Sequence, residues 1–206
     1  MSTSARNTQW VIYSFVIAMI YAIIRYNIFK NVPWSDFPVY IFNKSVALTI
    51  IMLMYYYRTS VSKKIVSAES VWPIMYILAF THLILSLTIL QPNYFEKFYS
   101  AGHLNLTGSL SLLSGVIAFI GFTIMGLIKL LKAVNVNFTI NKLYISILKF
   151  INIFFVLIHV FVMGFKGWLS PNEWPGYLLP ISLVAFIICL TAIIVAWYNK
   201  RKEIAY

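Results

Sequence analysis

The sequence predicts an all-α polytopic membrane protein, a bundle of six transmembrane helices, from three observations. The chain has 206 residues, of which 61% are hydrophobic and only 10% are charged, whereas soluble domains carry roughly 25% charged residues. Its mean hydropathy is +0.85. Its apolar residues lie in long continuous runs, and in lipid such runs satisfy their backbone hydrogen bonds as helices rather than as barrel strands. The lipid bilayer is therefore the predicted partner of most of the surface.

Six apolar runs are each long enough to cross a hydrocarbon core about 30 Å thick as a helix. They cover residues 9–26, 38–57, 71–91, 106–128, 144–164 and 178–198. The connections between them are too short to hold a soluble domain, so we expect a single integral membrane domain over residues 1–206. No small-residue cleavage site follows the first run, which we expect to be a retained helix rather than a signal peptide.

The basic residues predict how the helices are oriented. Ten of the sixteen Lys and Arg belong to the N-terminus, the second and fourth connections and the C-terminal tail, namely Arg6, Arg58, Lys63, Lys64, Lys129, Lys132, Lys142, Lys200, Arg201 and Lys202. Only four belong to the other connections: Arg25, Lys30, Lys97 and Lys166. Because cytoplasmic segments carry the excess of Lys and Arg, both termini are predicted to be cytoplasmic, with the protein in the cell (inner) membrane. The formal net charge of +11 is then a topology signal, and we expect no nucleic-acid partner.

Two histidines stand in the middle of apolar runs, where a polar ring is costly unless it is neutral and partnered. His82 lies in the third run and His159 in the fifth. In the predicted topology these helices are parallel, and both rings lie near the middle of the membrane or slightly outward of it. Two neutral imidazoles at one depth are what bis-histidine ligation of a haem b requires. Alternatively, each ring hydrogen-bonds a neighbouring helix and only holds helices together. The histidine positions alone leave both interpretations open.

The fourth run carries small residues on one helical face. Gly108, Ser111, Gly115 and Ala118 are separated by steps of three and four residues. Such a face lets a neighbouring helix or a flat cofactor approach closely. The pattern alone does not distinguish these two interpretations.

Four features of the second to fifth runs carry a family resemblance. The second run contains Phe42-Asn-Lys-Ser-Val-Ala-Leu, and in the third run aromatic residues precede His82-Leu-Ile-Leu. The fourth run begins with the partly polar segment Leu104-Asn-Leu-Thr-Gly108, and the fifth run contains His159. Over residues 38–165 the chain resembles the ferric-reductase-like transmembrane domain. Its short six-helix layout is most similar to the haem-bearing membrane subunit of the bacterial methionine-sulfoxide reductase system.

The resemblance implies a single haem b with His82 and His159 as its axial ligands, and with Gly108, Ser111 and Gly115 packed against the macrocycle. Family members with two haems repeat a histidine further along both helices. Here the corresponding places, around Phe95 and Ser146, hold no histidine, so a second haem is not expected.

Two cations and a third histidine have open roles. Lys44 lies inside the second run with no acidic residue in the same helix, so it either snorkels to the headgroups or contacts a haem propionate, an anionic substrate or a quinone carbonyl. Arg25, at the outer end of the first run, is either an ordinary arginine of the membrane interface or a contact to a haem propionate. His103 lies in an outer loop, where it is either solvated or lines a substrate or quinone pocket.

The predicted function is that of a membrane b-type cytochrome. It would carry electrons through one haem from a quinol, or a flavin on a partner protein, to an acceptor protein or small molecule at the outer face. No catalytic residue is predicted, since the five acidic residues lie at helix ends or in loops and the one cysteine, Cys189, lies in an apolar run. The competing hypothesis is a cofactor-free six-helix membrane subunit or a small-solute permease.

Overall fold

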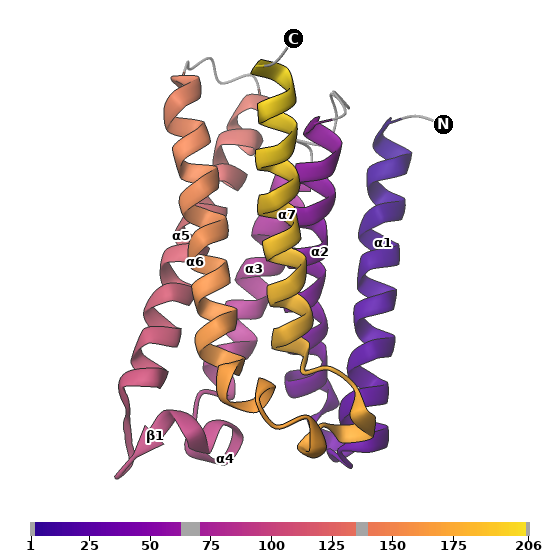
Figure 1. Cartoon of the computed structure of the whole chain (residues 1–206), viewed down its shortest axis with the longest axis vertical. Coiled ribbons are helices and arrows are strands. Elements are labelled where there is room, and N and C mark those ends of the chain that lie inside the picture. The colour runs from indigo at the N-terminus through magenta and orange to yellow at the C-terminus, as the bar shows by residue number, and fades with distance from the viewer. Residues whose placement is uncertain (1–2, 63–70, 135–139, 205–206) are drawn as a thin grey trace.

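The computed structural model describes residues 3–62, 71–134 and 140–204. Six long helices run side by side along one axis, and both ends of the chain lie at the same end of the bundle (Figure 1). We call this the terminal end, and the opposite end, which carries the short helix α4, the α4 end. Lys63 and Lys64, two of the residues used to predict orientation, lie outside the described residues.

The long helices are α1 (Thr3–Ala22), α2 (Phe42–Ser62), α3 (Val71–Thr88), α5 (Leu106–Ala133), α6 (Lys142–Trp168) and α7 (Ile181–Ile204). Two π-helical turns, Ile23–Phe29 and Phe37–Ile41, extend α1 and precede α2. At the α4 end lie α4 (Pro92–Phe95), the antiparallel strands β1 (Tyr99–Ser100) and β2 (His103–Leu104), and 3₁₀ turns at Trp34–Asp36, Glu96–Phe98, Pro171–Glu173 and Pro175–Tyr177.

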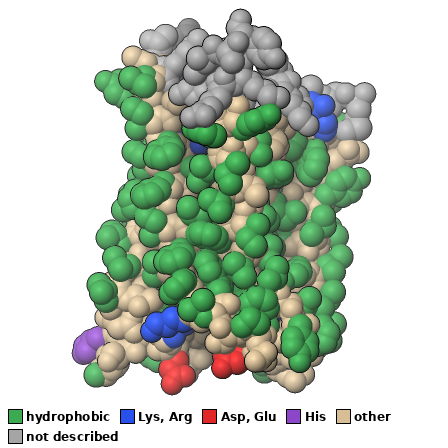
Figure 2. Space-filling model, in the orientation of Figure 1, with side chains coloured by type: hydrophobic (Ala, Val, Ile, Leu, Met, Phe, Trp, Pro, Cys, Tyr) green, Lys and Arg blue, Asp and Glu red, His purple; other side chains and the backbone are tan. Residues whose placement is uncertain are grey.

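Six helical segments have the length and hydropathy needed to cross a membrane, which confirms the predicted fold class. They are Ala5–Phe29, Trp34–Ser60, Val71–Thr88, Leu106–Ala133, Leu143–Trp168 and Pro175–Tyr198. In the view of Figure 2, hydrophobic side chains cover the middle of the molecule and charged ones gather at its ends. This is an integral membrane protein.

Asparagine side chains define where α5 and α6 begin. The Asn105 side-chain oxygen accepts a hydrogen bond from the Gly108 backbone N–H at 3.0 Å, and Asn141 accepts one from the Leu143 N–H at 2.8 Å. Each satisfies a backbone donor that the first turn of a helix leaves free.

Five of the long helices form a closed ring. Around it, α2 packs against α3, α3 against α5, α5 against α6, α6 against α7, and α7 against α2. Helix α1 packs on α2 from outside this ring. The ring places the third and fifth membrane helices, α3 and α6, on either side of α5, so that their inward faces surround one interior space.

Candidate functional site

The five-helix ring encloses a cavity of about 210 Å³, and both intramembrane histidines line it. His82 reaches it from α3 and His159 from α6. All five ring helices contribute to a mostly apolar wall that includes Leu48, Phe119 and Val160. The structure thus brings together the two residues that the sequence singled out.

The protonation of the His159 ring follows from its hydrogen bond. Its Nδ1 lies 2.8 Å from the backbone carbonyl oxygen of Ser111 on α5. A carbonyl oxygen only accepts hydrogen bonds, so Nδ1 is the donor, and in the neutral ring Nε2 carries the free lone pair.

The His82 ring is held in the same way by a side chain. Its Nδ1 lies 2.6 Å from the amide oxygen of Asn43 on α2. The Asn43 amide nitrogen donates to the Ser86 hydroxyl at 3.1 Å, which directs the amide oxygen toward the imidazole. Asn43 is only 4% exposed. The His82 Nδ1 therefore donates, and its Nε2 is the unprotonated nitrogen.

The two histidines consequently have the tautomer that metal ligation uses, in which one ring nitrogen is held by an acceptor and the other is free to bind. Within the described residues, no group of three or more His, Cys, Asp or Glu side chains lies close together. A bare structural zinc ion takes about four protein ligands, whereas a haem iron needs two axial ones. The donor set suits a haem better than a bare ion.

Small residues of α5 line the cavity, and two of them, Ser111 and Gly115, contact His159 of α6. A Cβ atom added at Gly115 would lie 3.0 Å from His159 Nδ1, so a larger residue there would push the imidazole slightly out of its observed position. One added at Gly108 would lie 2.7 Å from the Phe98 carbonyl oxygen. Gly108, Ser111 and Gly115 all belong to the cavity wall. This face of α5 therefore serves both roles that the sequence pattern could not distinguish: it allows close helix packing, and it leaves room for a ligand.

Lys44 lies at the α4 end of this cavity, inside a cage of aromatic rings. Its ammonium nitrogen is 4.3 Å from the centre of the Tyr40 ring, 5.1 Å from that of Tyr26 and 5.8 Å from that of Phe95. The rings stabilise the cation through their negative faces. No described carboxylate neutralises it. The cavity therefore has an uncompensated positive charge at this end.

Arg25 and His103 do not belong to the cavity wall. Arg25 is 6% exposed, and its guanidinium donates to the backbone carbonyl of Leu178, which ties the π-helical turn after α1 to the segment that precedes α7. Its predicted propionate contact stays a prediction. His103 is exposed on β2, in register with Ser100.

Lys97 lies beside the cavity without belonging to its wall, and the sequence pattern indicated only its contribution to orientation. The Lys97 ammonium donates to the Met163 carbonyl and lies 5.1 Å from the centre of the Phe98 ring, and both of these residues line the cavity. Loss of solvation, together with the nearby cations Lys44, Lys30 and Lys166, lowers the pKa of Lys97 to about 8. Together, Lys44 and Lys97 make the α4 end of the cavity electropositive.

Asn43 and Ser86 were also missed, although a signal was present. Ser86 follows His82 by one helical turn, and Asn43 is a polar residue next to Lys44 in an apolar run. Intramembrane polar residues are costly unless they pair with one another. Their pairing with His82 needed the structure.

No protein-family model, curated protein or solved structure matches this chain. The resemblance to the ferric-reductase-like transmembrane domain therefore depends on the residues quoted above and stays a hypothesis.

Proposed function

We propose that this protein is a membrane b-type cytochrome that binds one haem between His82 and His159 and transfers single electrons. One observation carries the proposal. The two histidines line the same cavity, and each has its Nδ1 on an oxygen acceptor, so that both Nε2 atoms are available as ligands. A pair of histidines that only held helices together would not need to share a cavity.

The residues around the cavity are chemically suited to a haem, but the cavity must widen to admit one. The wall is apolar, and Lys44 at its α4 end offers a positive charge to a propionate. The volume of about 210 Å³ is below the roughly 300–1,000 Å³ of typical ligand pockets. Entry of a macrocycle therefore requires flexible wall residues such as Leu83, Leu112 and Met163 to move aside.

The protein's own residues would set the behaviour of a bound haem, which supplies one-electron chemistry. His82 and His159 would hold the haem through their Nε2 atoms. Asn43 and the Ser111 carbonyl would hold the two rings in orientation, and Lys44 would raise the reduction potential by favouring the electron-rich state. The donor would be a quinol or a partner flavin, and the acceptor a protein or small molecule at the outer face.

Difference spectroscopy tests the proposal. The protein is produced in haem-replete cells, purified in mild detergent and scanned before and after dithionite reduction. We expect the sharp α-band of a low-spin b-type haem and one haem per chain by pyridine haemochrome assay. A protein without bound haem would favour the cofactor-free membrane subunit or permease instead.

Three matched histidine variants test the ligand assignment. His82→Ala and His159→Ala should each abolish the low-spin spectrum, because either change removes an axial ligand. His103→Ala should leave it intact, since this ring lies outside the cavity wall. A normal spectrum in either of the first two variants would refute the assignment.

A further inference from the structure

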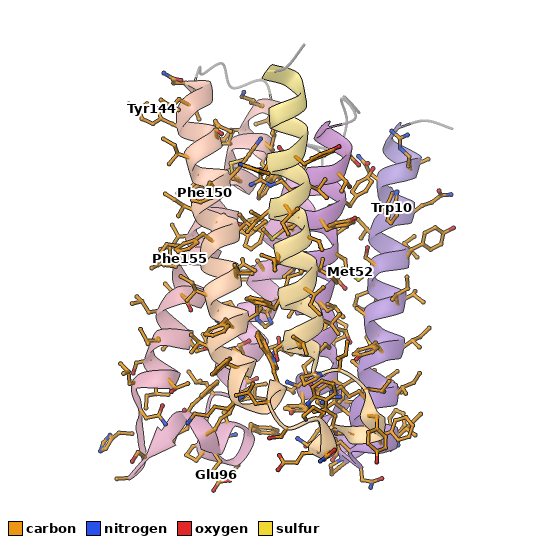
Figure 3. The ribbon with its side chains drawn as sticks, viewed as in Figure 1. Trp10, Met52, Glu96, Tyr144, Phe150 and Phe155 are labelled. Atoms are coloured by element: carbon orange, nitrogen blue, oxygen red, sulfur yellow. The ribbon has the colours of Figure 1, made fainter. Side chains whose placement is uncertain are left out.

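A second hollow lies on the outside of the five-helix ring, near the terminal end. It is a groove of about 430 Å³ bordered by α1, α2 and α7, and its wall includes Arg6, Trp10, Ser14, Met52, Tyr55 and Ile188. Because α2 packs against both α1 and α7, it forms the floor of the groove. Figure 3 labels Trp10 on α1 and Met52 on the part of the bundle that borders this helix.

The groove is distinct from the histidine cavity. Along α2, the cavity wall ends at Ile51, and the groove wall runs from Met52 to Ser60. Along α7, Ala185 is the last cavity residue and Ile188 the first groove residue. The proposed haem would therefore not fill this groove.

Arg6 supplies an unused hydrogen-bond donor at the end of the groove nearest the terminus. Its Nε atom is buried and has no hydrogen-bond partner in the described part of the chain. A buried donor without a partner is unfavourable, and more so when the group is charged. The guanidinium fork matches the oxygens of a phosphate or carboxylate.

The rest of the groove changes from aromatic to apolar with distance from Arg6. Trp10 stacks on Tyr56 with ring centres 5.0 Å apart, one turn from Arg6. Tryptophan and tyrosine rings of this kind belong at the headgroup level of a bilayer. Met52 and Ile188 lie deeper, in the apolar part of their helices. A ligand with an anionic head and an apolar chain would match the groove, with its head at Arg6 and its chain along the apolar residues.

We propose that this groove binds an anionic phospholipid from the leaflet at the terminal end. Its phosphate would accept hydrogen bonds from Arg6, its glycerol region would lie beside Trp10, and one acyl chain would pass along Met52 and Ile188. Arg6 favours a lipid of net negative charge, because the choline cation of a zwitterionic phospholipid would offset the attraction between its phosphate and the guanidinium. This assignment does not depend on haem binding.

Lipid-dependent thermal stability of the full-length protein in detergent tests the proposal. Phosphatidylglycerol, phosphatidylcholine with the same acyl chains, and inorganic phosphate are titrated separately. We expect phosphatidylglycerol to raise the melting temperature at much lower concentration than phosphatidylcholine. Inorganic phosphate should have little effect, because it lacks the acyl chain. Equal effects of the two lipids, or of phosphate and phosphatidylglycerol, would overturn the proposal.

Variants locate the site. Arg6→Gln should weaken phosphatidylglycerol binding by roughly fivefold to tenfold, the effect of losing one cation near a phosphate. Lys132→Gln removes a positive charge from the same end of the molecule, on exposed α5 surface, and should change binding little. Met52→Phe should narrow the groove and weaken long-chain lipid binding without altering net charge. Equal losses in the Arg6 and Lys132 variants, or undiminished binding in the Met52 variant, would contradict the assignment.

Discussion

At the scale of single residues, the orientation of His82 depends on Asn43. The ring nitrogen and the amide oxygen are 2.6 Å apart, and the Ser86 hydroxyl accepts from the other side of the same amide. His159 needs no such side chain, because the Ser111 backbone carbonyl accepts the hydrogen bond from its Nδ1. Mutation can therefore remove the Nδ1 acceptor of one proposed ligand directly, and that of the other only by moving the backbone.

We expect Asn43→Ala to lower haem affinity by roughly 10–100-fold, the usual effect of losing a residue that orients a metal ligand. Without the acceptor, the His82 ring is free to rotate or to carry its proton on Nε2. Haem titration of the apoprotein measures the change. Ser86→Ala is the matched control: it keeps the acceptor of His82 and should have a smaller effect. Wild-type affinity in the Asn43 variant would show that the hydrogen bond does not matter for ligation.

At the scale of helices, glycines on α5 set how closely α6 approaches. A Cβ atom added at Gly121 would lie 3.1 Å from the Asn152 Cβ and closer still to its amide nitrogen. Asn152 is fully buried, and its amide donates to the Ala118 carbonyl at 2.8 Å. The α5–α6 interface therefore combines a missing side chain with a hydrogen bond between helices, as membrane helix pairs commonly do.

Gly121→Ala should destabilise the protein by about 1–3 kcal/mol, because the new methyl group overpacks the interface and displaces the Asn152 amide. Unfolding by sodium dodecyl sulfate in mixed micelles measures this. Gly167→Ala is the control on α6, where an added Cβ meets nothing within 4 Å. It should be neutral or stabilising by up to about 1 kcal/mol, as expected for Gly to Ala in a helix. Similar losses in both variants would contradict the packing argument.

At the scale of the whole molecule, an even number of crossings places both termini on one side (Figure 1). The positive-inside rule predicts that this side is the cytoplasm. The proposed transfer of electrons to an acceptor at the outer face depends on that prediction.

Cysteine labelling tests the orientation, since the one native cysteine, Cys189, is buried. A membrane-impermeant maleimide should label Ser100→Cys, at the α4 end, in intact cells. Lys132→Cys, at the terminal end, should react only after the cells are lysed, and the unmodified protein should not react in either condition. The reverse pattern would place the termini outside and invert the proposed direction.

The sequence by itself determined the properties that depend on position along the chain. Long apolar runs require helices in lipid whatever their neighbours, so six membrane helices were predictable, and counting along them placed His82 and His159 at similar depth. The π-helical turn Ile23–Phe29 was not predictable, because the apolar run that contains it does not distinguish one helical winding from another.

Only the tertiary structure decided which faces of the helices meet. Depth follows from residue number, but the rotation of a helix about its axis is set by packing against its neighbours. That rotation turns both histidines into one cavity, joins Asn43 to His82, and leaves Arg25 on the Leu178 carbonyl instead of the cavity wall. Helix packing also places α1 outside the ring, and so forms the groove at Arg6 that no pattern in the sequence indicated.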